Sequence, residues 1–204
     1  MITKAARYGI KMYVATDAVD EYVLRTSMYT GDDQGIISKD DTLKKTTNVV
    51  LDLVQPYFNT YRSVKTDRYY KSIELAKELA KKKLYNTGTL MANRIAKELR
   101  WIAKVSRKKE RGEFDHHLYQ YKDDSGKIEN IGLVIWKDRK PVYVLTSECS
   151  TVEVDVCIRR SKQGLLHIDQ PISVAQYTKY IGGVDVSDQK RPHHPCIYCM
   201  VPQK

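Results

Sequence analysis

The feature that most limits the possible folds is the alternation of strand-like and helix-like segments over the first 94 residues. Strand-like segments alternate apolar and polar side chains, whereas helix-like segments repeat apolar side chains every three or four residues. A mixed sheet covered by helices, an α/β fold, buries such a pattern most naturally. In chain order we expect strands at 8–17 and 21–31, a helix at 42–58, a strand at 60–67, a helix at 72–84 and a strand at 86–94.

Polar residues mark the ends of several of these elements. Asp41 is placed to cap the helix at 42–58, and Ser72 is placed to cap the helix at 72–84. Asp17 and Asp67 each fall at or just beyond the C-terminal end of an expected strand. Either aspartate alone is an ordinary turn residue, but if the two strands are neighbours, two carboxylates converge at one edge of the sheet.

The pattern changes after Gly112, where β-rich segments follow one another with charged turns between them. The next helical pattern begins at about Ile172. We therefore expect a first α/β part, an all-β insertion or subdomain, a helix with two acidic residues, and a divergent tail. Their boundaries are 1–112, 113–171, 172–189 and 190–204.

Positive charge is concentrated in one part of the chain. Residues 61–112 carry 16 Lys and Arg against five Asp and Glu, and the segments on either side are close to neutral. Such a segment is either a solvated lysine-rich surface or a site for a polyanion such as nucleic acid. The candidate nucleic-acid contacts are Lys81, Lys82, Lys83, Arg94, Arg100, Trp101, Arg107, Lys108 and Lys109.

Composition excludes some classes of protein. No run approaches the roughly 20 apolar residues of a membrane helix, and the N-terminal segment lacks the apolar core of a secretory signal. Four cysteines are too few for a disulfide framework, which favours a reducing compartment. The tail offers zinc ligand types at His193, His194, Cys196 and Cys199. Because a structural zinc site normally pairs two ligand clusters, we do not expect zinc at His193, Cys196 and Cys199.

Three motifs occur together in one order. They are YGIKMY followed by Asp17 and later YTG, Asp67 followed by two tyrosines and the helix capped by Ser72, and YTKYIGGVDVSDQ at 177–189. In character and order they resemble the catalytic domain of piggyBac transposases, including the domesticated piggyBac-derived proteins. The resemblance covers about residues 4–189.

The resemblance implies an RNase H-like fold with a β-rich insertion between the second and third acidic residues. It places the acidic positions of a DDE site on Asp17, Asp67 and Asp185, with Asp188 as a further acidic residue. Three carboxylates of this kind hold two Mg²⁺ ions about 3.5–4 Å apart, with Mn²⁺ as a substitute. The implied partner is DNA, both transposon ends and target, and the implied setting is a nuclear protein with a possible homodimer.

The segment at 177–189 is expected to be one helix with Asp185 and Asp188 on the same face. Gly182 and Gly183 cost that helix roughly 1 kcal/mol each relative to alanine, so a close approach of backbone or substrate is expected there.

Two departures from the family pattern keep the alternatives open. Arg68 and Lys71 stand where the family has an amide and a hydroxyl, which predicts two cations beside a metal ligand. The likeness of motifs stops after Gln189, and few residues precede the first strand, so we expect a catalytic core shortened at both ends. The chain is then a metal-dependent transposase core, a non-catalytic DNA-binding remnant, or a decayed fragment without a role.

Overall fold

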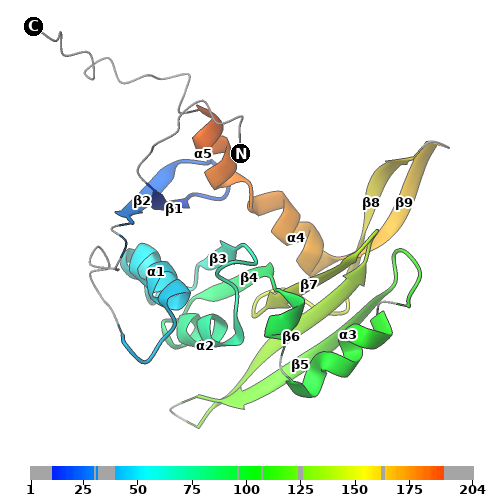
Figure 1. Cartoon of the computed structure of the whole chain (residues 1–204), viewed down its shortest axis with the longest axis horizontal. Coiled ribbons are helices and arrows are strands. Elements are labelled where there is room, and N and C mark those ends of the chain that lie inside the picture. The colour runs from blue at the N-terminus through cyan, green and yellow to red at the C-terminus, as the bar shows by residue number, and fades with distance from the viewer. Residues whose placement is uncertain are drawn as a thin grey trace, which may run out of the picture.

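The computed structural model describes residues 11–29, 31, 40–95, 97–106, 108–123, 126–161 and 164–190. Within these ranges strands and helices alternate in the first half and strands dominate the second (Figure 1). The strands are β1 (Met12–Thr16), β2 (Val23–Met28), β3 (Ser63–Thr66), β4 (Tyr85–Thr89), β5 (Phe114–Lys122), β6 (Ile128–Lys137), β7 (Pro141–Thr146), β8 (Val154–Ser161) and β9 (Gly164–Pro171). The helices are α1 (Lys45–Val54), α2 (Ile73–Lys81), α3 (Arg100–Ser106), α4 (Ile172–Tyr180) and α5 (Gly183–Lys190), with short 3₁₀ turns at Gln55–Tyr57, Ala92–Arg94 and Lys97–Leu99.

The main sheet has five strands in the order β3-β4-β7-β6-β5. β3 and β4 are parallel and α2 connects them, whereas the other neighbours pair antiparallel. Two hairpins stand apart from this sheet, β1–β2 and β8–β9. The architecture is the mixed α/β arrangement that the alternating pattern predicted.

The core lies on both faces of β6. Ile131, Leu133 and Ile135 pack with residues of α2 and α3 on one face. Val134 and Trp136 pack with residues of β9 and α4 on the other. Since successive side chains of a strand point to opposite faces, a strand that is buried on both sides reads as a continuous apolar run.

The β1–β2 hairpin is held mainly by helices. Tyr13 packs against Val49 and Leu53 of α1, and Arg25 of β2 forms an ion pair with the buried carboxylate of Asp52 (3.4 Å). In Figure 1 the hairpin lies beside α5, at the end of the molecule opposite the β5–β6 part of the main sheet. The hairpin is therefore joined to the sheet through α1 and α5 rather than through strand pairing.

Residues 113–171 are β-rich. Within them β7 pairs with β4 and carries β6 and β5 into the main sheet, whereas β8 and β9 pair with each other. Two expectations need correction. Asp41 does not cap α1, whose N-cap position is Lys44. The segment at 172–189 is two helices, interrupted at Ile181–Gly182, rather than one.

Some expectations fall on residues that lie outside the described ranges. They include Arg107 and the tail from residue 191, with the zinc candidates His193, Cys196 and Cys199. Among the helices that the structure does describe, none combines the length and the apolar character needed to cross a membrane.

Ser72 caps α2 as the sequence predicted, and this contact gives a direct test of the fold. Its hydroxyl accepts a hydrogen bond from the backbone N–H of Leu75 (3.0 Å). We expect Ser72→Ala to lower the free energy of unfolding by about 1 kcal/mol, and Ser72→Gly to lower it by only a few tenths. Urea denaturation followed by circular dichroism measures both. An unchanged midpoint for Ser72→Ala would show that the cap contributes nothing to stability.

Candidate active site

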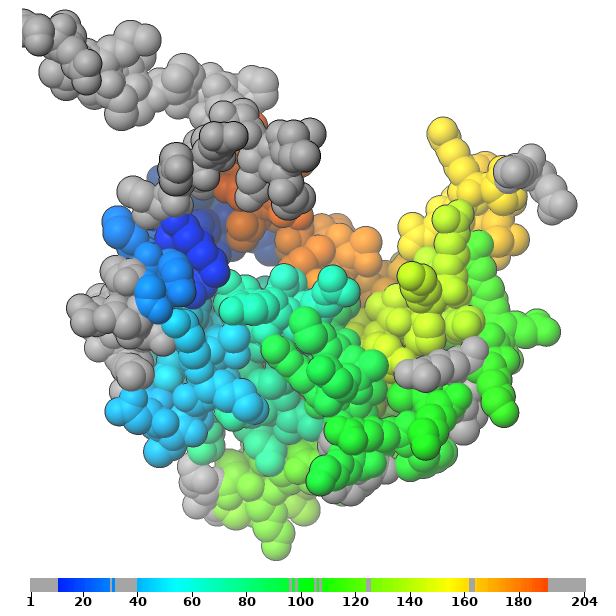
Figure 2. Space-filling view, in the orientation of Figure 1, coloured from blue at the N-terminus to red at the C-terminus, as the bar shows by residue number. Residues whose placement is uncertain are grey.

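A cavity of about 620 Å³ lies between the β1–β2 hairpin and the rest of the molecule. Its walls include β1, β3, α1 and the start of α5, and Figure 2 shows the surface hollowed between the blue hairpin, the orange helices and the cyan segment. Asp17, Asp67 and Asp185 all belong to the lining. The fold thus brings three carboxylates from distant parts of the sequence to one cavity.

The cavity separates two strands that carry the first two of these aspartates. Within the described residues β1 pairs only with β2, and β3 pairs only with β4. The facing residues of both strands line the cavity. The two strands are therefore not paired neighbours in one sheet, although both line the same cavity.

Asp17 is held by the turn that follows β1. One oxygen of its carboxylate accepts hydrogen bonds from the backbone N–H groups of Val19 (2.8 Å) and Asp20 (2.9 Å). The N–H of Asp20, then that of Val19, holds the pKa of Asp17 below its ordinary value, and the charge of Arg62 acts in the same direction. Asp17 is accordingly an anion at neutral pH.

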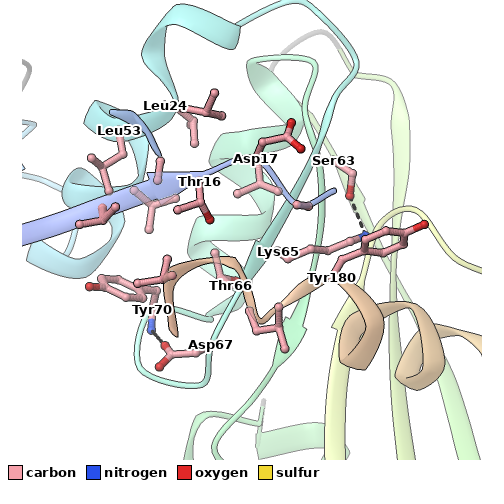
Figure 3. Close-up of a pocket in the computed structure, with 18 of the residues that line it drawn as sticks. Thr16, Asp17, Leu24, Leu53, Ser63, Lys65, Thr66, Asp67, Tyr70 and Tyr180 are labelled. Carbon is pink, nitrogen blue, oxygen red and sulfur yellow. Dashed lines mark hydrogen bonds between the residues drawn. The ribbon is translucent and has the colours of Figure 1, made fainter. Parts of the chain in front are cut away.

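Asp67 is fixed in a similar way at the end of β3. Its carboxylate accepts a hydrogen bond from the backbone N–H of Tyr69 (2.8 Å) and a longer one from that of Tyr70 (3.4 Å). In Figure 3 the carboxylates of Asp17 and Asp67 are drawn well apart, with Asp17 near Ser63 and Asp67 near Tyr70. Each carboxylate faces its own turn.

Arg94 supports the turn that carries Asp67. One guanidinium nitrogen, Nη1, donates to the carbonyl oxygens of Tyr69 (2.7 Å), Lys71 (3.1 Å) and Arg68 (3.3 Å). Arg94 was a candidate nucleic-acid contact. In the structure its guanidinium stabilises the turn that carries Asp67.

Asp185 reaches the cavity because α5 packs closely against the end of β1. A side chain at Gly183 would place its Cβ 2.5 Å from Oγ1 of Thr16 and 3.0 Å from the carbonyl oxygen of Asp17. Gly182 has open space at the same point. The expected close approach is therefore confirmed for Gly183 alone. Asp188, one turn beyond Asp185, is exposed and is not part of the cavity lining.

Tyr177 of α4 lies in the field of two of the carboxylates. Burial raises the pKa of its phenol, the hydrogen bond with Thr89 (3.1 Å) opposes this, and the charges of Asp67 and Asp185 raise it further. Tyr177 is thus a neutral hydroxyl beside the acidic residues. The sequence predicted no role for Tyr177, and the available signal was its position at the start of the motif at 177–189.

The carboxylate oxygens of the cavity are suitable ligands for a divalent metal ion, but they are too far apart to hold one together. Carboxylate oxygens are the hard ligands that Mg²⁺ prefers, and three carboxylates share one cavity. Within the described ranges, however, no three acidic, histidine or cysteine side chains are grouped closely enough to hold a metal ion.

Arg68 and Lys71, the two cations predicted beside Asp67, lie in different environments. Arg68 is exposed next to the site. Lys71 is fully buried, and its amine donates a short hydrogen bond to the side-chain oxygen of the buried Asn86. Burial lowers the pKa of Lys71 well below its ordinary value, and the charge of Lys65 lowers it further. The expectation that Lys71 is a cation beside the metal ligand is therefore wrong, because its amine is buried against Asn86.

The polar residues of β3 also have partners. Lys65 forms an ion pair with Glu148 (2.5 Å) and donates to the hydroxyl of Ser63 (2.8 Å). Burial alone would raise the pKa of Glu148, but hydrogen bonds from Lys65 and Ser63 hold it below its ordinary value. Ser63 and Lys65 thus both have Glu148 as a partner on β3, which is an edge strand of the main sheet.

The candidate nucleic-acid contacts are spread over several elements. Lys81 forms an ion pair with Glu78 (3.0 Å), whereas Lys82 and Lys83 are exposed at the end of α2. Arg100 and Trp101 are exposed on α3, with 61% of Trp101 accessible. After α3, Lys108 is exposed, but Lys109 forms an ion pair with Asp115 (2.7 Å).

Two comparisons place these features among known proteins. The family model described as Transposase IS4, of the DDE type, matches residues 1–198. A cryo-EM structure of piggyBac transposase, in a synaptic complex with hairpin DNA, is 27% identical in sequence and superposes with a TM-score of 0.65. The match covers 93% of this chain and 35% of the transposase chain.

The comparisons bear on two expectations. The RNase H-like α/β fold is confirmed by the piggyBac neighbour. The expectation that the likeness ends at Gln189 is wrong, because the family match continues to residue 198.

Gly183 and Gly182 form a matched pair for testing how α5 reaches the cavity. We expect Gly183→Ala to destabilise the protein by roughly 1–3 kcal/mol, because the new methyl group meets Thr16 and the Asp17 carbonyl. Gly182→Ala has room for the methyl group and should leave stability unchanged or raise it slightly. Thermal denaturation of both variants measures this difference, and equal effects would contradict the close approach.

Lys71 should make stability depend on pH in a specific direction. The unfolded chain holds a proton on this lysine up to its ordinary pKa of 10.5, whereas the folded chain releases it at lower pH. Because the unfolded state then binds more protons, stability rises with pH between the two pKa values. We expect wild type to gain stability relative to Lys71→Met as pH rises from 7 to 10, by at most about 1.4 kcal/mol per pH unit. Parallel stability curves for the two proteins would indicate that Lys71 keeps its charge when folded.

Proposed function

Because the chain belongs to the DDE transposase family described as Transposase IS4, we propose that it is a transposase catalytic domain that cleaves and transfers DNA strands with divalent metal ions. The observation that carries the proposal is the shared cavity of Asp17, Asp67 and Asp185. These residues come from the end of β1, the end of β3 and the first turn of α5.

The proposed metal is Mg²⁺, with Mn²⁺ as a substitute, held by Asp17, Asp67 and Asp185. When bound, a pair of such ions activates an oxygen nucleophile and stabilises the leaving oxygen of a phosphodiester. Asp188, on the next turn of α5, is proposed as a further acidic residue of the same site.

The other residues around the cavity supply position and charge. The turn bonds of Asp17 and Asp67 hold both carboxylates in place, and those of Asp17 also lower its pKa. The hydroxyl of Tyr177, neutral at physiological pH, can donate a hydrogen bond to an oxygen of the DNA backbone. Arg68, exposed beside Asp67, is placed to contact a DNA phosphate.

The proposed partner is DNA, and transposon ends and target DNA are its substrates. The piggyBac neighbour was captured with hairpin DNA, and residues 61–112 of this chain carry a strong positive charge. Assembly as a homodimer and a nuclear location are part of the same proposal and rest on family resemblance.

A non-catalytic DNA-binding remnant is the second candidate function. One observation favours it. In the described part of the chain, the three carboxylates line one cavity but are not grouped closely enough to hold a metal ion. Under this alternative the chain binds DNA through its cations, and metal ions have no effect on the DNA.

Strand cleavage decides between the two functions. With Mg²⁺ or Mn²⁺ and a hairpin or nicked DNA substrate, we expect cleavage by wild type. Asp17→Asn, Asp67→Asn and Asp185→Asn should each reduce it at least about 100-fold, because each removes a proposed metal ligand. The matched control is Asp20→Asn, since Asp20 contacts Asp17 through its backbone and not its side chain.

DNA binding, measured by fluorescence anisotropy on the same proteins, completes the test. Salt-sensitive binding without metal-dependent cleavage would reject the catalytic proposal and support the remnant. Equal loss of cleavage in Asp20→Asn would show that the effect is not specific to the three carboxylates.

A further inference from the structure

Two loops far apart in the sequence lie side by side at the start of β3 and β4. The backbone N–H of Asn59 donates to the carbonyl of Lys82 (2.8 Å), and that of Tyr61 donates to the carbonyl of Lys83 (2.9 Å). The N–H of Tyr85 donates to the carbonyl of Arg62 (2.9 Å). These bonds continue the contact between the two parallel strands and hold both loops in a fixed relation.

The backbone of these loops has an unusual conformation. Asn59, Tyr61 and Lys83 have φ values of 63°, 56° and 54°, in the left-handed region that residues with side chains rarely adopt. For a residue as bulky as Tyr61 this conformation costs free energy, and such residues tend to cluster at functional positions. Asn or Gly at position 61 would adopt this left-handed conformation at a lower cost in free energy than Tyr61 does.

The loops present aromatic rings to solvent. Tyr61 is 60% exposed and Tyr85 is 42% exposed, and their ring centroids are 6.4 Å apart at an angle of 45°. Adjacent exposed apolar groups mark interaction sites more often than single scattered side chains do. The pair is therefore a candidate contact surface rather than part of the core.

The same two loops carry cations. Lys82 and Lys83 are exposed, and neither has an ion pair with a described carboxylate. The Lys82 amine lies 5.4 Å from the centroid of the Phe58 ring, and the Arg62 guanidinium lies 5.2 Å from that of Tyr57. Such mixed aromatic and basic surfaces bind single-stranded nucleic acid, where rings stack on bases and cations contact phosphates.

We propose that Tyr61 and Tyr85, with Lys82 and Lys83, form a binding site for unpaired nucleotides of DNA. We call these four residues the tyrosine platform. The tyrosines stack on exposed bases, and the two lysines contact the phosphates between them. Since every base has an aromatic face, the platform binds with little dependence on sequence.

The platform is continuous with the cavity of the candidate active site. Arg62 follows Tyr61 directly and Leu84 precedes Tyr85, and both line that cavity. Arg62 is also close enough to Asp17 to lower the pKa of its carboxyl. A strand that leaves the platform therefore passes a cation at the entrance to the site. The platform's binding of DNA does not depend on cleavage taking place there.

The charges favour nucleic acid over a proline-rich peptide, which also docks on exposed tyrosines. The platform contributes two lysines, and it lies in the segment with 16 Lys and Arg against five Asp and Glu. Beyond the platform, Lys127 at the β5–β6 turn forms an ion pair with Glu129 and also lies in the field of Asp123. The positive charge that a polyanion meets is therefore that of Lys82, Lys83 and Arg62.

The test is binding of a fluorescein-labelled 12-nucleotide oligothymidine to the full chain, in EDTA so that no cleavage occurs. Tyr61→Asn removes the ring and suits the left-handed backbone, so the variant should be at least as stable as wild type. We expect it, and Tyr85→Ala, to bind about 5- to 100-fold more weakly. Tyr85→Phe keeps the ring and should bind like wild type. Tyr22→Ala removes a tyrosine elsewhere that is exposed to an even greater extent, and it is the matched control.

Salt dependence separates stacking from phosphate contacts. Lys82→Gln and Lys83→Gln should each reduce the slope of log K against log salt by about 0.7, the value for one single-strand phosphate contact. Tyr61→Asn should leave the slope unchanged. The same measurements with a blunt duplex should show no dependence on either tyrosine.

Several results would overturn the platform without touching the proposed catalysis. One is wild-type affinity in both Tyr61→Asn and Tyr85→Ala, which would leave only an electrostatic surface. Another is the same loss with the blunt duplex. A third is a polyproline peptide that binds with this tyrosine dependence while the oligonucleotide does not. Because the binding is measured in EDTA, where no cleavage occurs, its outcome is independent of the active-site proposal.

Discussion

The structure depends on one strand that is buried on both faces. Ile131, Leu133 and Ile135 of β6 need cover from one side, and Val134 and Trp136 need cover from the other. The helices α2 and α3 supply the first cover and β9 with α4 supplies the second (Figure 1). Because α4 must lie on that second face, the chain after β9 returns across the sheet toward β3 and β1. The acidic helix α5 reaches the cavity as a consequence of how β6 is buried.

The packing of α5 against β1 depends on a glycine, which has no side chain to keep the two backbones apart. Gly183 allows the backbone of α5 to touch Thr16 and the carbonyl of Asp17. This contact places Asp185 on the wall that Asp17 also lines, and it makes the β1–β2 hairpin part of the site. The hairpin has no strand pairing with β3 in the described residues, so its packing against α1, α5 and Tyr70 determines the distance between the first two carboxylates. That explains why the aspartates line the same cavity but are not close enough together to hold a metal ion.

Around Asp67 the structure separates cations that the sequence could not distinguish. Arg68 is exposed, Arg94 holds three carbonyl oxygens of the turn, and Lys71 is buried against Asn86. All three contribute equally to the net charge of residues 61–112, but only Arg68 among them is open to a phosphate. Net charge therefore indicates a polyanionic partner, whereas burial decides which side chains can meet it. The cations that remain exposed include Lys82 and Lys83, next to Tyr61 and Tyr85.

The sequence by itself determined the elements whose signals are local. The apolar alternation of β1, the strand before Asp67 and the cap of α2 by Ser72 depend on neighbouring residues, so they could be predicted. The order of three motifs likewise indicated the family and its acidic residues before any distance was known. Only the tertiary structure decided that β5, β6 and β7 join the main sheet, that Lys71 faces inward, and that Gly183 rather than Gly182 makes the close contact. Strand pairing, burial and close backbone contacts join residues that are far apart in the chain. Their free energies depend on which distant residues meet, and the local sequence does not show this.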